Sequence, residues 1–353
     1  MSKQNNEPEQ KKPDFEINAS RQFMSWLIEQ NISLGFSTYK SGKVFLIGHN
    51  PDQSLSVFER TFDRPMGLWT DGDVLWLSTL YQLYRFKNSL PMGANSDGYD
   101  RLFVPQKSYM TAGIDVHDIA PVDSQTPPIF VNTLFSCLAT VSDDYSFKTL
   151  WQPSFISELA PEDRCHLNGL ALRDGLPAYV TAISTTNVAD GWRDHRHGGG
   201  VVMDVASNQV IARGFSMPHS PRWAHGKLWM ANSGAGEFGY IDVETGQFEV
   251  VAFCPGYIRG VTIVGDYAVV GLSKPRHKTF QGLPLDARLA KENIEARCGL
   301  YVVDLIKGGT PHWLTMEGLV TEMYDVVSLA DVARPSMIGF RNDQIRRVIS
   351  LEP

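Results

Sequence analysis

Three histidines recur at similar points in successive segments of the chain, at His117, His166 and His219. Each lies beside a short apolar segment with the pattern of a β-strand. Neutral imidazole binds transition metals, and it also acts as a general acid or base because its pKa lies near neutral pH. We predict that these histidines bind one divalent metal (iron, zinc or manganese) or transfer protons. A purely structural role, bonding the backbone at strand starts, is the alternative.

Other polar side chains lie at equivalent points. Arginine suits carboxylate or phosphate recognition, and a buried carboxyl or phenol can assist proton transfer. The arginines could instead pair with Asp115, Glu322 or Asp325. The predicted catalytic residues are His117, His166, Tyr324 and Glu322; the predicted metal ligands are His117, His166 and His219, with Glu322 or Asp115 as a carboxylate ligand; the predicted substrate-binding residues are Arg64, Asn168, Arg222, Arg259, Trp192 and His195.

Two long polar segments could cover such a site. Residues 182–200 contain Trp192 and His195 and end in three glycines, and residues 273–297 contain a helical pattern near 285–296. Long loops in compact domains often form lids or binding loops. We therefore expect both segments to lie over the site.

Several familiar motifs are missing. The chain has no GxSxG, no GxGxxG that opens a helix, and no P-loop lysine after its glycine run, so we predict no nucleotide cofactor. Its four cysteines, Cys137, Cys165, Cys254 and Cys298, form no CxxC pair, which is typical of reduced thiols in a cytoplasmic protein. Cys165 and His166 are adjacent on a predicted strand and should point to opposite faces, which argues against a Cys–His nucleophile.

The elements that position these residues repeat along the chain. Each copy is a short strand, a tight turn that usually contains glycine, and a second apolar strand. We align six copies at Gly67, Asp118, Gly169, Pro221, Gly260 and Asp325. Further strand patterns lie between these hairpins, and four strands per repeat of roughly 40–50 residues indicate a β-propeller blade.

The predicted fold is therefore all-β, a propeller with six blades most favoured and seven possible. A weaker seventh copy begins at Gly35, but it is too close to Gly67 for four strands. We expect the N-terminal strands, with residues 54–61, to complete the last blade, which begins with a hairpin over residues 324–340. Closing the ring in this way removes exposed strand edges.

The first strand of each propeller blade lines the central channel. Residues at the starts of these strands should therefore converge at one mouth of the channel. This predicts a mouth formed by Arg64 and Met66, Asp115 and His117, His166 and Asn168, His219 and Arg222, Tyr257 and Arg259, and Glu322 and Tyr324. The register of the fourth pair is open because Pro218 and Pro221 interrupt that strand.

Length and charge set further limits. The chain has 353 residues and a formal net charge of −7, which argues against broad nucleic-acid binding. Its polar N-terminus has no secretory signal, and it has no apolar run of roughly 20 residues that could cross a bilayer. We predict a disordered tail over 1–17, a helix over 18–31 and a single propeller domain over 32–353, in a cytoplasmic protein that could form homo-oligomers.

The region from about 32 to 351 resembles a bacterial family of conserved hypothetical proteins with no assigned activity, through HLNGLAL, MPHSPRW, LWMANSG and YIRGV at the starts of blades. A more distant likeness is to six-bladed lactonases of the gluconolactonase and senescence-marker type and to strictosidine-synthase-like propellers. Those lactonases hold a divalent metal on the channel axis with Glu, Asn and Asp. Asn168 and Glu322 are similar in kind, whereas the histidine-rich mouth departs from that pattern.

Two classes of function follow. We favour an enzyme that acts on a small polar or anionic substrate at the channel mouth, as a hydrolase, isomerase or oxidoreductase, with or without a histidine-bound metal. The alternative is a non-catalytic propeller that binds a ligand or another protein, since fold alone does not imply catalysis. Convergent ionisable groups favour the enzyme. Carbohydrate binding through Trp192 and Trp223 is a third interpretation that the sequence leaves open.

Overall fold

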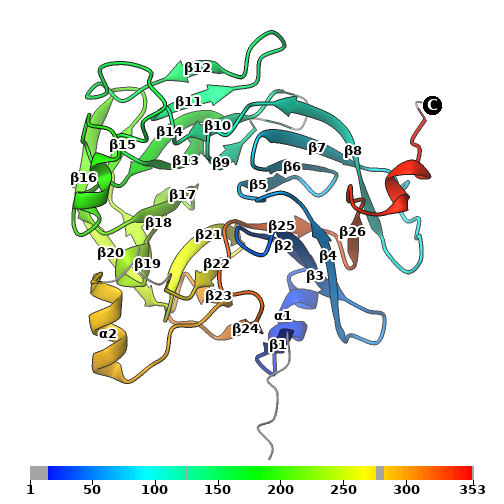
Figure 1. The fold of residues 1–353 in the computed structure, drawn as a ribbon. Coiled ribbons are helices and arrows are strands. Elements are labelled where there is room, and N and C mark those ends of the chain that lie inside the picture. Colours follow the sequence, from blue (N-terminus) through cyan, green and yellow to red (C-terminus); the bar gives the residue numbers. More distant parts are fainter. Residues whose placement is uncertain (1–14, 122, 124–125, 276–281, 352–353) are drawn as a thin grey trace, which may run out of the picture.

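The computed structural model describes residues 15–121, 123, 126–275 and 282–351. Six sheets, each built on four antiparallel strands, stand around a central channel, and Figure 1 looks down that channel. The innermost strands of the six blades face the centre of the view. The six-bladed propeller predicted from the repeat is therefore confirmed.

The blades follow the chain in order, except that its two ends share the last one. Blade 1 comprises β5 (Leu68–Thr70), β6 (Val74–Ser78), β7 (Gln82–Asn88) and β8 (Arg101–Met110). Blade 2 comprises β9 (Val116–Ala120), β10 (Ile129–Asn132), β11 (Cys137–Thr140) and β12 (Lys148–Trp151). Blade 3 comprises β13 (Leu167–Arg173), β14 (Leu176–Ala182), β15 (Gly200–Asp204) and β16 (Gln209–Phe215).

The second half of the ring repeats this order. Blade 4 comprises β17 (Pro218–Ala224), β18 (Lys227–Asn232), β19 (Glu237–Ile241) and β20 (Phe248–Phe253). Blade 5 comprises β21 (Tyr257–Val264), β22 (Tyr267–Ser273), β23 (Gly299–Asp304) and β24 (His312–Gly318). Blade 6 comprises β25 (Val326–Ala330), β2 (Ile32–Thr38), β3 (Lys43–His49) and β4 (Leu55–Thr61).

Blade 6 closes the ring. Its innermost strand β25 comes from the C-terminal part of the chain and pairs with β2 from the N-terminal part, with Gly35 opposite Val327. The predicted closure by N-terminal strands is confirmed, and the weaker seventh copy is the β2–β3 hairpin of this blade. The predicted hairpin over residues 324–340 is wrong. Its second half, β26 (Pro335–Met337), pairs in parallel with β8 on the outside of blade 1, because β2 already occupies the edge beside β25.

The N-terminal segment also differs from the prediction. Residues Phe15–Ala19 form strand β1, which pairs with β24 and extends blade 5. Residues 15–17, which were predicted to belong to a disordered tail, are therefore part of a sheet. The helix α1 is shorter than predicted and covers Phe23–Glu29. Its buried face, Phe23, Trp26 and Leu27, packs against blades 5 and 6. The rest of the predicted tail, residues 1–14, lies outside the described residues.

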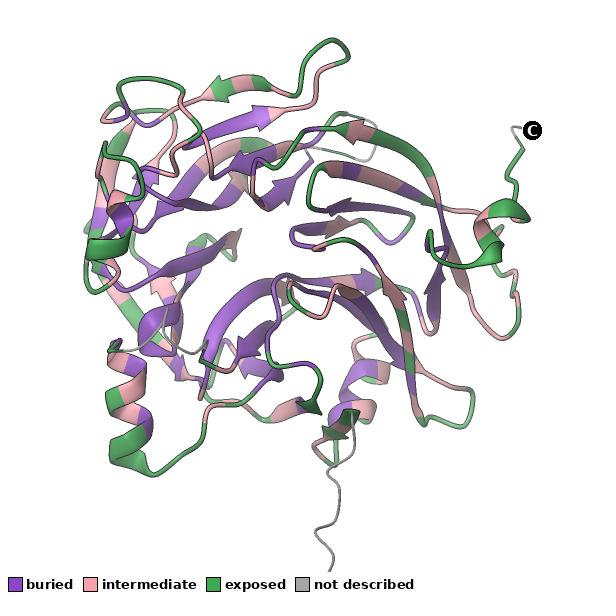
Figure 2. Ribbon diagram, viewed as in Figure 1, coloured by how far each residue is buried: buried purple, intermediate pink, exposed green. Residues whose placement is uncertain are grey.

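The core lies between neighbouring blades. Apolar side chains alternate along the strands and fill the spaces from one sheet to the next, and Figure 2 shows that burial increases toward the channel. Phe86, Phe130 and Phe238 are fully buried in three of these spaces. The remaining helical elements lie outside the sheets: α2 (Pro284–Glu292), and the 3₁₀ turns η1 (Gly191–His195), η2 (Ser233–Ala235) and η3 (Asp343–Arg346).

A repeated hydroxyl contact occurs at five of the six junctions between neighbouring blades. The serine or threonine at or just after the end of a second strand donates to a backbone carbonyl near the start of the next blade's first strand. The contacts are Ser78 to Val116 (3.2 Å), Thr133 to Leu167 (2.7 Å), Ser233 to Ile258 (2.8 Å), Ser273 to Met323 (3.1 Å) and Ser37 to Met66. They hold the beginnings of the first strands at a common height around the channel.

Candidate functional site

Six structurally equivalent side chains surround one mouth of the channel. At four junctions, the carbonyl that receives the hydroxyl contact belongs to the residue before the mouth residue. The repeat spacing supplies the other two positions. The ring comprises Met66, His117, Asn168, His219, Arg259 and Tyr324, one residue from each blade. All six were predicted at the mouth, and the exception is the pairing in blade 4, where His219 was paired with Arg222.

The backbone conformation explains that exception. Arg64, Asp115, His166 and Met217 follow one another at intervals of 51 residues, and all adopt left-handed φ angles between 52° and 57°. Met217, two residues before His219, is thus the equivalent of His166. The correct anchor in blade 4 is Ser220, because Pro221 shifts the alignment by one residue. A shift of one residue changes the face on which a side chain lies.

The main cavity at this mouth measures ≈ 170 Å³. Its lining residues come from every blade except blade 4. Its lining residues are Tyr39, Arg64, Met66, Asp115, His117, Asp163, His166, Trp192, Arg193, Arg259 and Tyr324. Six of the predicted site residues therefore come together here, namely Arg64, His117, His166, Trp192, Arg259 and Tyr324.

One carboxylate orients two groups in this cavity. Asp163 accepts a hydrogen bond from His166 Nδ1 (2.9 Å) and another from Trp192 Nε1 (2.8 Å). The indole of Trp192 also lies against the imidazole of His166, with ring centroids 4.2 Å apart. Because Nδ1 carries the proton that goes to Asp163, Nε2 of His166 is left as a proton acceptor. Aspartate, histidine and the η1 turn are thus held as one unit.

His117 is oriented by the backbone and by Thr133. The Thr133 hydroxyl donates to the Leu167 carbonyl, so its oxygen accepts from His117 Nδ1 at 2.7 Å. The Asp115 carbonyl lies 3.0 Å from the same nitrogen. Both contacts favour the tautomer with a proton on Nδ1 and an accepting Nε2. The rings of His117 and His166 meet edge to face, with centroids 4.8 Å apart.

Burial keeps His117 neutral. It lowers the pKa of His117 well below 6.5, and the neighbouring His166 and then the positive charge of Arg259 lower it further. At neutral pH the cavity therefore presents an uncharged imidazole beside the Asp163–His166 pair. On its other side, the ring of Tyr324 meets His117 at 5.5 Å, and the guanidinium of Arg259 lies 5.6 Å from the centre of the Tyr324 ring.

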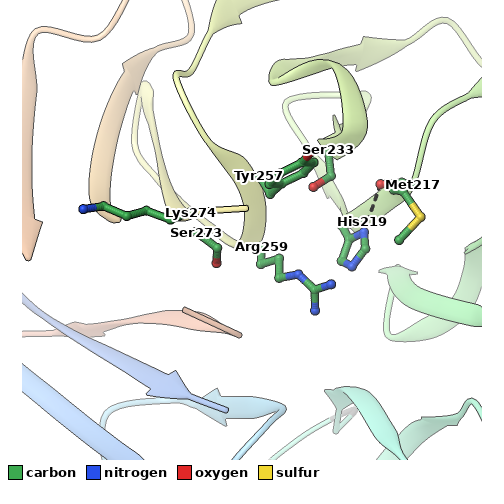
Figure 3. A pocket seen from close by; sticks show the side chains of 7 residues that line it. All are labelled: Met217, His219, Ser233, Tyr257, Arg259, Ser273 and Lys274. Carbon is green, nitrogen blue, oxygen red and sulfur yellow. Dashed lines mark hydrogen bonds between the residues drawn. The ribbon is translucent and has the colours of Figure 1, made fainter. Parts of the chain in front are cut away.

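His219 lies in a separate, narrower cavity. His219 Nδ1 donates to the Met217 carbonyl (3.0 Å), while Asn168 Nδ2 donates to the Pro218 carbonyl (2.9 Å) and contacts the His219 ring. Figure 3 shows His219 and Arg259 directed toward the same side, with Lys274 extending away from them. This cavity measures only ≈ 10 Å³, about the space of one water molecule.

The predicted three-histidine ligand set is not formed. His117 and His166 line the main cavity, whereas His219 lines the narrow one. Within residues 15–275 and 282–351, apart from the short gaps near 122–125, no three His, Cys, Asp or Glu side chains lie close enough together to hold a metal ion. The donor set of the described residues therefore does not fit the divalent metal that the sequence suggested.

Arg222 does not lie at the mouth. It lies deeper in the channel, where it donates to Asp118 (2.8 Å) and to the carbonyl of Val261 (3.0 Å), and approaches Asp325 at 3.7 Å. Arg222 therefore does not reach the mouth at which its substrate contact was predicted, and it approaches Asp325, as the alternative interpretation allowed. Pro221 and the β-bulge after His219 rotate Arg222 toward the opposite mouth, where it lines another cavity of ≈ 290 Å³.

Four predicted site residues are already paired within the protein or lie in other surroundings. Arg64 reaches the cavity but forms an ion pair with Asp115, as the alternative interpretation expected. Glu322 is buried outside the cavity lining and accepts from the backbone N–H of Lys40 at 2.7 Å. His195 is exposed and borders a separate surface groove with Arg213. Asn168, as noted, bonds the first strand of blade 4.

The cysteines do not contribute to this chemistry. All four are buried free thiols. Burial raises the pKa of the Cys165 thiol to about 12, so it remains protonated at neutral pH. The sequence argument against a Cys165–His166 nucleophile is thus supported by the environment of the thiol.

Three cavity residues were missed by the sequence analysis: Tyr39, Asp163 and Arg193. Asp163 precedes His166 by three residues. An acidic residue so close to a candidate base could have been recognised in the sequence as its hydrogen-bond partner. Arg193 follows Trp192, whose loop had already been selected. Tyr39 lies in the β2–β3 turn, and only the closure of blade 6 brings it beside Tyr324 (ring centroids 6.1 Å).

The chain belongs to a protein family described as a domain of unknown function (DUF4915), whose model matches residues 21–338. No curated protein matches the chain in sequence. No helix in the described part of the chain is long and apolar enough to cross a membrane.

One solved structure supports the fold alone, and a second is a weaker match. A chain of a nidogen/laminin complex is 11% identical, with a TM-score of 0.54, over 85% of this chain and 99% of that chain. Virginiamycin B lyase from Staphylococcus aureus is 12% identical, with a TM-score of 0.40, over 73% of this chain and 96% of that chain. These identities are too low to carry an activity from either protein to this one.

Proposed function

We propose that this protein is an enzyme that moves a proton on a small polar substrate held in the main cavity. The observation that carries the proposal is the Asp163–His166 pair, with His166 Nδ1 bonded to the carboxylate at 2.9 Å and a second imidazole beside it. A histidine held in one tautomer by a carboxylate is the arrangement that general-base catalysis requires.

In this proposal, Nε2 of His166 removes a proton from carbon or oxygen of the substrate. The proton then resides on the imidazole, and the Asp163 carboxylate stabilises the positive charge that develops on the ring. Returning the same proton to a different atom completes an isomerisation. If the substrate instead loses a leaving group before the proton returns, the reaction is an elimination. The leaving group departs with the electron pair of the broken bond, and the proton leaves with that group.

His117 and Tyr324 have supporting roles. Neutral His117 offers Nε2 as a hydrogen-bond acceptor that fixes a substrate hydroxyl or amide, and the Tyr324 phenol is the candidate donor to developing negative charge. Arg259 supplies positive charge for an acidic substrate. No step is assigned to a metal ion, because the described donor groups do not form a ligand set.

The test uses the full chain and a panel of small oxo acids, hydroxy acids and lactones. Each compound is incubated with the protein in D₂O, and proton NMR follows deuterium incorporation and conversion. We expect turnover by the wild type and a loss of about 10²–10⁴-fold in His166→Gln. Asp163→Asn should also lose activity, because the asparagine no longer fixes the tautomer of His166.

His225→Gln is the matched control. His225 is exposed in the turn after β17, whereas His219 lies at the opposite end of this strand. Within the described residues, His225 Nε2 contacts only the Gly265 carbonyl. Equal activity of His166→Gln and His225→Gln, with both variants folded by circular dichroism, contradicts the proposal. A panel in which ligands bind but none is turned over or deuterated also contradicts it and favours a binding protein.

A further inference from the structure

A second cavity, of ≈ 290 Å³, lies at the end of the channel opposite the histidine-bearing mouth. It is larger than the main cavity of ≈ 170 Å³, and its described lining comes from the first strands of all six blades. In five blades, the residue directly after the repeat anchor lines this cavity and is at most 2% exposed. These residues are Leu68, Ile119, Leu170, Val261 and Val326. They give the cavity an apolar, closely packed inner end.

Larger apolar side chains surround this inner end without being fully buried. Trp69, Leu172, Trp223 and Ile263 line the cavity, come from four different blades and remain partly exposed. The ring of side chains at the other mouth is mainly polar, so the two ends of the channel differ in chemistry. Apolar surface in a concave site gains free energy when a ligand removes it from water. The lining therefore favours a ligand with an apolar body.

Trp223 is held in position by its neighbours. Its indole stacks on the ring of Tyr179, with centroids 5.7 Å apart, and the guanidinium of Arg173 lies 4.5 Å from the centre of the indole. Arg173 is not part of the described lining, and it lies 3.8 Å from the carboxylate of Asp174. A side chain that is already fixed loses little freedom when a ligand binds. The tryptophan wall is thus prepared for a ligand.

The charges at this end of the channel favour an uncharged ligand. Arg222 is the one charged residue in the described lining, and Asp118 and Asp325 lie 2.8 and 3.7 Å from its guanidinium. Burial raises the pKa of Asp325 to about 7, so the cluster carries between zero and one negative charge near neutral pH. It therefore has no net positive charge to attract an anion. A cation would meet Arg222 first, because neither carboxylate belongs to the lining.

One pair of hydroxyls offers the ligand a hydrogen bond. Thr262 Oγ1 and Ser328 Oγ lie 3.1 Å apart in the lining, and only one of their two protons is used between them. The second proton can be donated to an oxygen of the ligand. By contrast, Thr70 already donates to the Val74 carbonyl (2.8 Å), and Arg222 already bonds a carboxylate and backbone carbonyls. The polar contact with a ligand thus falls to the Thr262–Ser328 pair.

We propose that this cavity is a second ligand site, for an uncharged compound with one or two rings and one hydroxyl or carbonyl oxygen. The rings contact the partly exposed apolar side chains, and the oxygen bonds the Thr262–Ser328 pair. The volume of ≈ 290 Å³ is close to the roughly 300 Å³ at which small-molecule sites begin. The proposal goes beyond the proposed enzyme activity, because the two cavities share no described lining residue.

The experiment compares three probes that share one ring system and differ in charge. Isothermal titration calorimetry on the wild-type full chain at pH 7 measures binding of uncharged 2-naphthol, anionic 2-naphthoate and cationic 2-naphthylmethylammonium. We expect saturable binding of 2-naphthol, at least tenfold tighter than that of either charged probe. Equal or tighter binding of a charged probe overturns the assignment of an uncharged ligand. Absence of saturable 2-naphthol binding overturns the site itself.

Variants locate the bound probe. Ser328→Phe fills part of the cavity and removes one hydroxyl, so it should weaken 2-naphthol binding at least tenfold. The matched control is Ser154→Phe, which adds the same ring at an exposed position outside the cavity lining and should leave the affinity unchanged. Unchanged affinity in Ser328→Phe, or an equal loss in Ser154→Phe, contradicts the proposal.

A second variant keeps the test valid if Ser328→Phe does not fold, as judged by circular dichroism. The double variant Thr262→Val/Ser328→Ala removes both hydroxyls with little change in volume. It should weaken 2-naphthol binding at least threefold, and an unchanged affinity would overturn the role of the hydroxyl pair.

This test is separable from the test of catalysis. His166→Gln should bind 2-naphthol as tightly as the wild type, because His166 lies in the other cavity. Loss of 2-naphthol binding in His166→Gln would place the probe in the main cavity and overturn the second site. Failure of the D₂O assay to detect turnover would contradict the proposed enzyme while leaving the 2-naphthol result unchanged.

Discussion

Asp118 and Arg222, which are 104 residues apart in sequence, form a 2.8 Å ion pair inside the channel. Arg222 also approaches Asp325 at 3.7 Å. Each aspartate accepts a backbone N–H from the next blade: Asp118 from Leu170 (3.0 Å) and Asp325 from Leu68 (2.8 Å). These two aspartates directly follow His117 and Tyr324 in sequence. The central ion-pair cluster therefore fixes the strands that carry two of the proposed site residues.

Loss of the central cation should destabilise the fold strongly. Arg222→Met leaves Asp118 and Asp325 buried and close to each other without a positive partner, and breaking a buried pair in this way costs about 3–5 kcal/mol. Urea denaturation measures the change. The control is Arg341→Met, which removes an exposed ion pair with Asp63 and should cost less than about 1 kcal/mol. Similar losses in the two variants would contradict the central role of Arg222.

Asp325 should make stability depend on pH. Burial, and then the charge of Asp118, raise the pKa of Asp325 from 3.8 to about 7. The folded chain therefore holds this proton more tightly than the unfolded chain, and its contribution to stability falls as pH rises from about 4 to about 7. The expected change is on the order of a few kcal/mol.

The comparison of Asp325→Asn with wild type isolates this effect. The asparagine resembles the protonated acid, so the variant should be less destabilised relative to wild type at pH 8 than at pH 5. Free energies of unfolding from urea titrations at the two pH values measure the difference. An equal deficit at both values would indicate that Asp325 does not titrate in this range.

His117 should remain neutral to well below pH 6.5. Because the pKa of His117 is lowered in the folded chain, the unfolded chain binds a proton at this imidazole more readily. The neutral ring therefore contributes its full stabilisation of the fold above pH 6.5, and this stabilisation is lost as the pH falls. NMR of ¹⁵N-labelled imidazoles follows the titration, with the signal assigned by its absence in His117→Gln. A midpoint near 6.5 would contradict the burial of this ring.

Thr133 should act on both structure and site. Thr133→Val removes the contact to the Leu167 carbonyl and the acceptor for His117 Nδ1, and should cost about 1–2 kcal/mol of stability. It should also alter the imidazole NMR signature of His117 and lower turnover. Ser78→Ala is the matched control because it removes the equivalent blade contact, to Val116, without touching His117. The same imidazole change in both variants would show that Thr133 acts only through the blade.

Much of the site was predictable because the repeat places one residue per blade at the channel mouth. His117, Arg259 and Tyr324 could be assigned from periodicity, since equivalent positions in successive blades must lie at equal heights. His219 was also at the mouth, but the one-residue shift at Pro221 paired it wrongly with Arg222. Propeller periodicity does not say how many neighbours share one cavity, so it could not separate His219 from the other two histidines.

The sequence by itself favoured six blades over seven and indicated the closure of the ring by the N-terminal strands and a mouth of mostly polar side chains, because local strand and turn patterns repeat along the chain. Only the tertiary structure decided which of those side chains meet. Asp163 and Tyr39 lie outside the repeated positions, so their contacts with His166 and Tyr324 depend on the packing of loops. The direction of Arg222 depends on a bulge, and its two carboxylate partners come from distant parts of the chain that meet only when the ring closes.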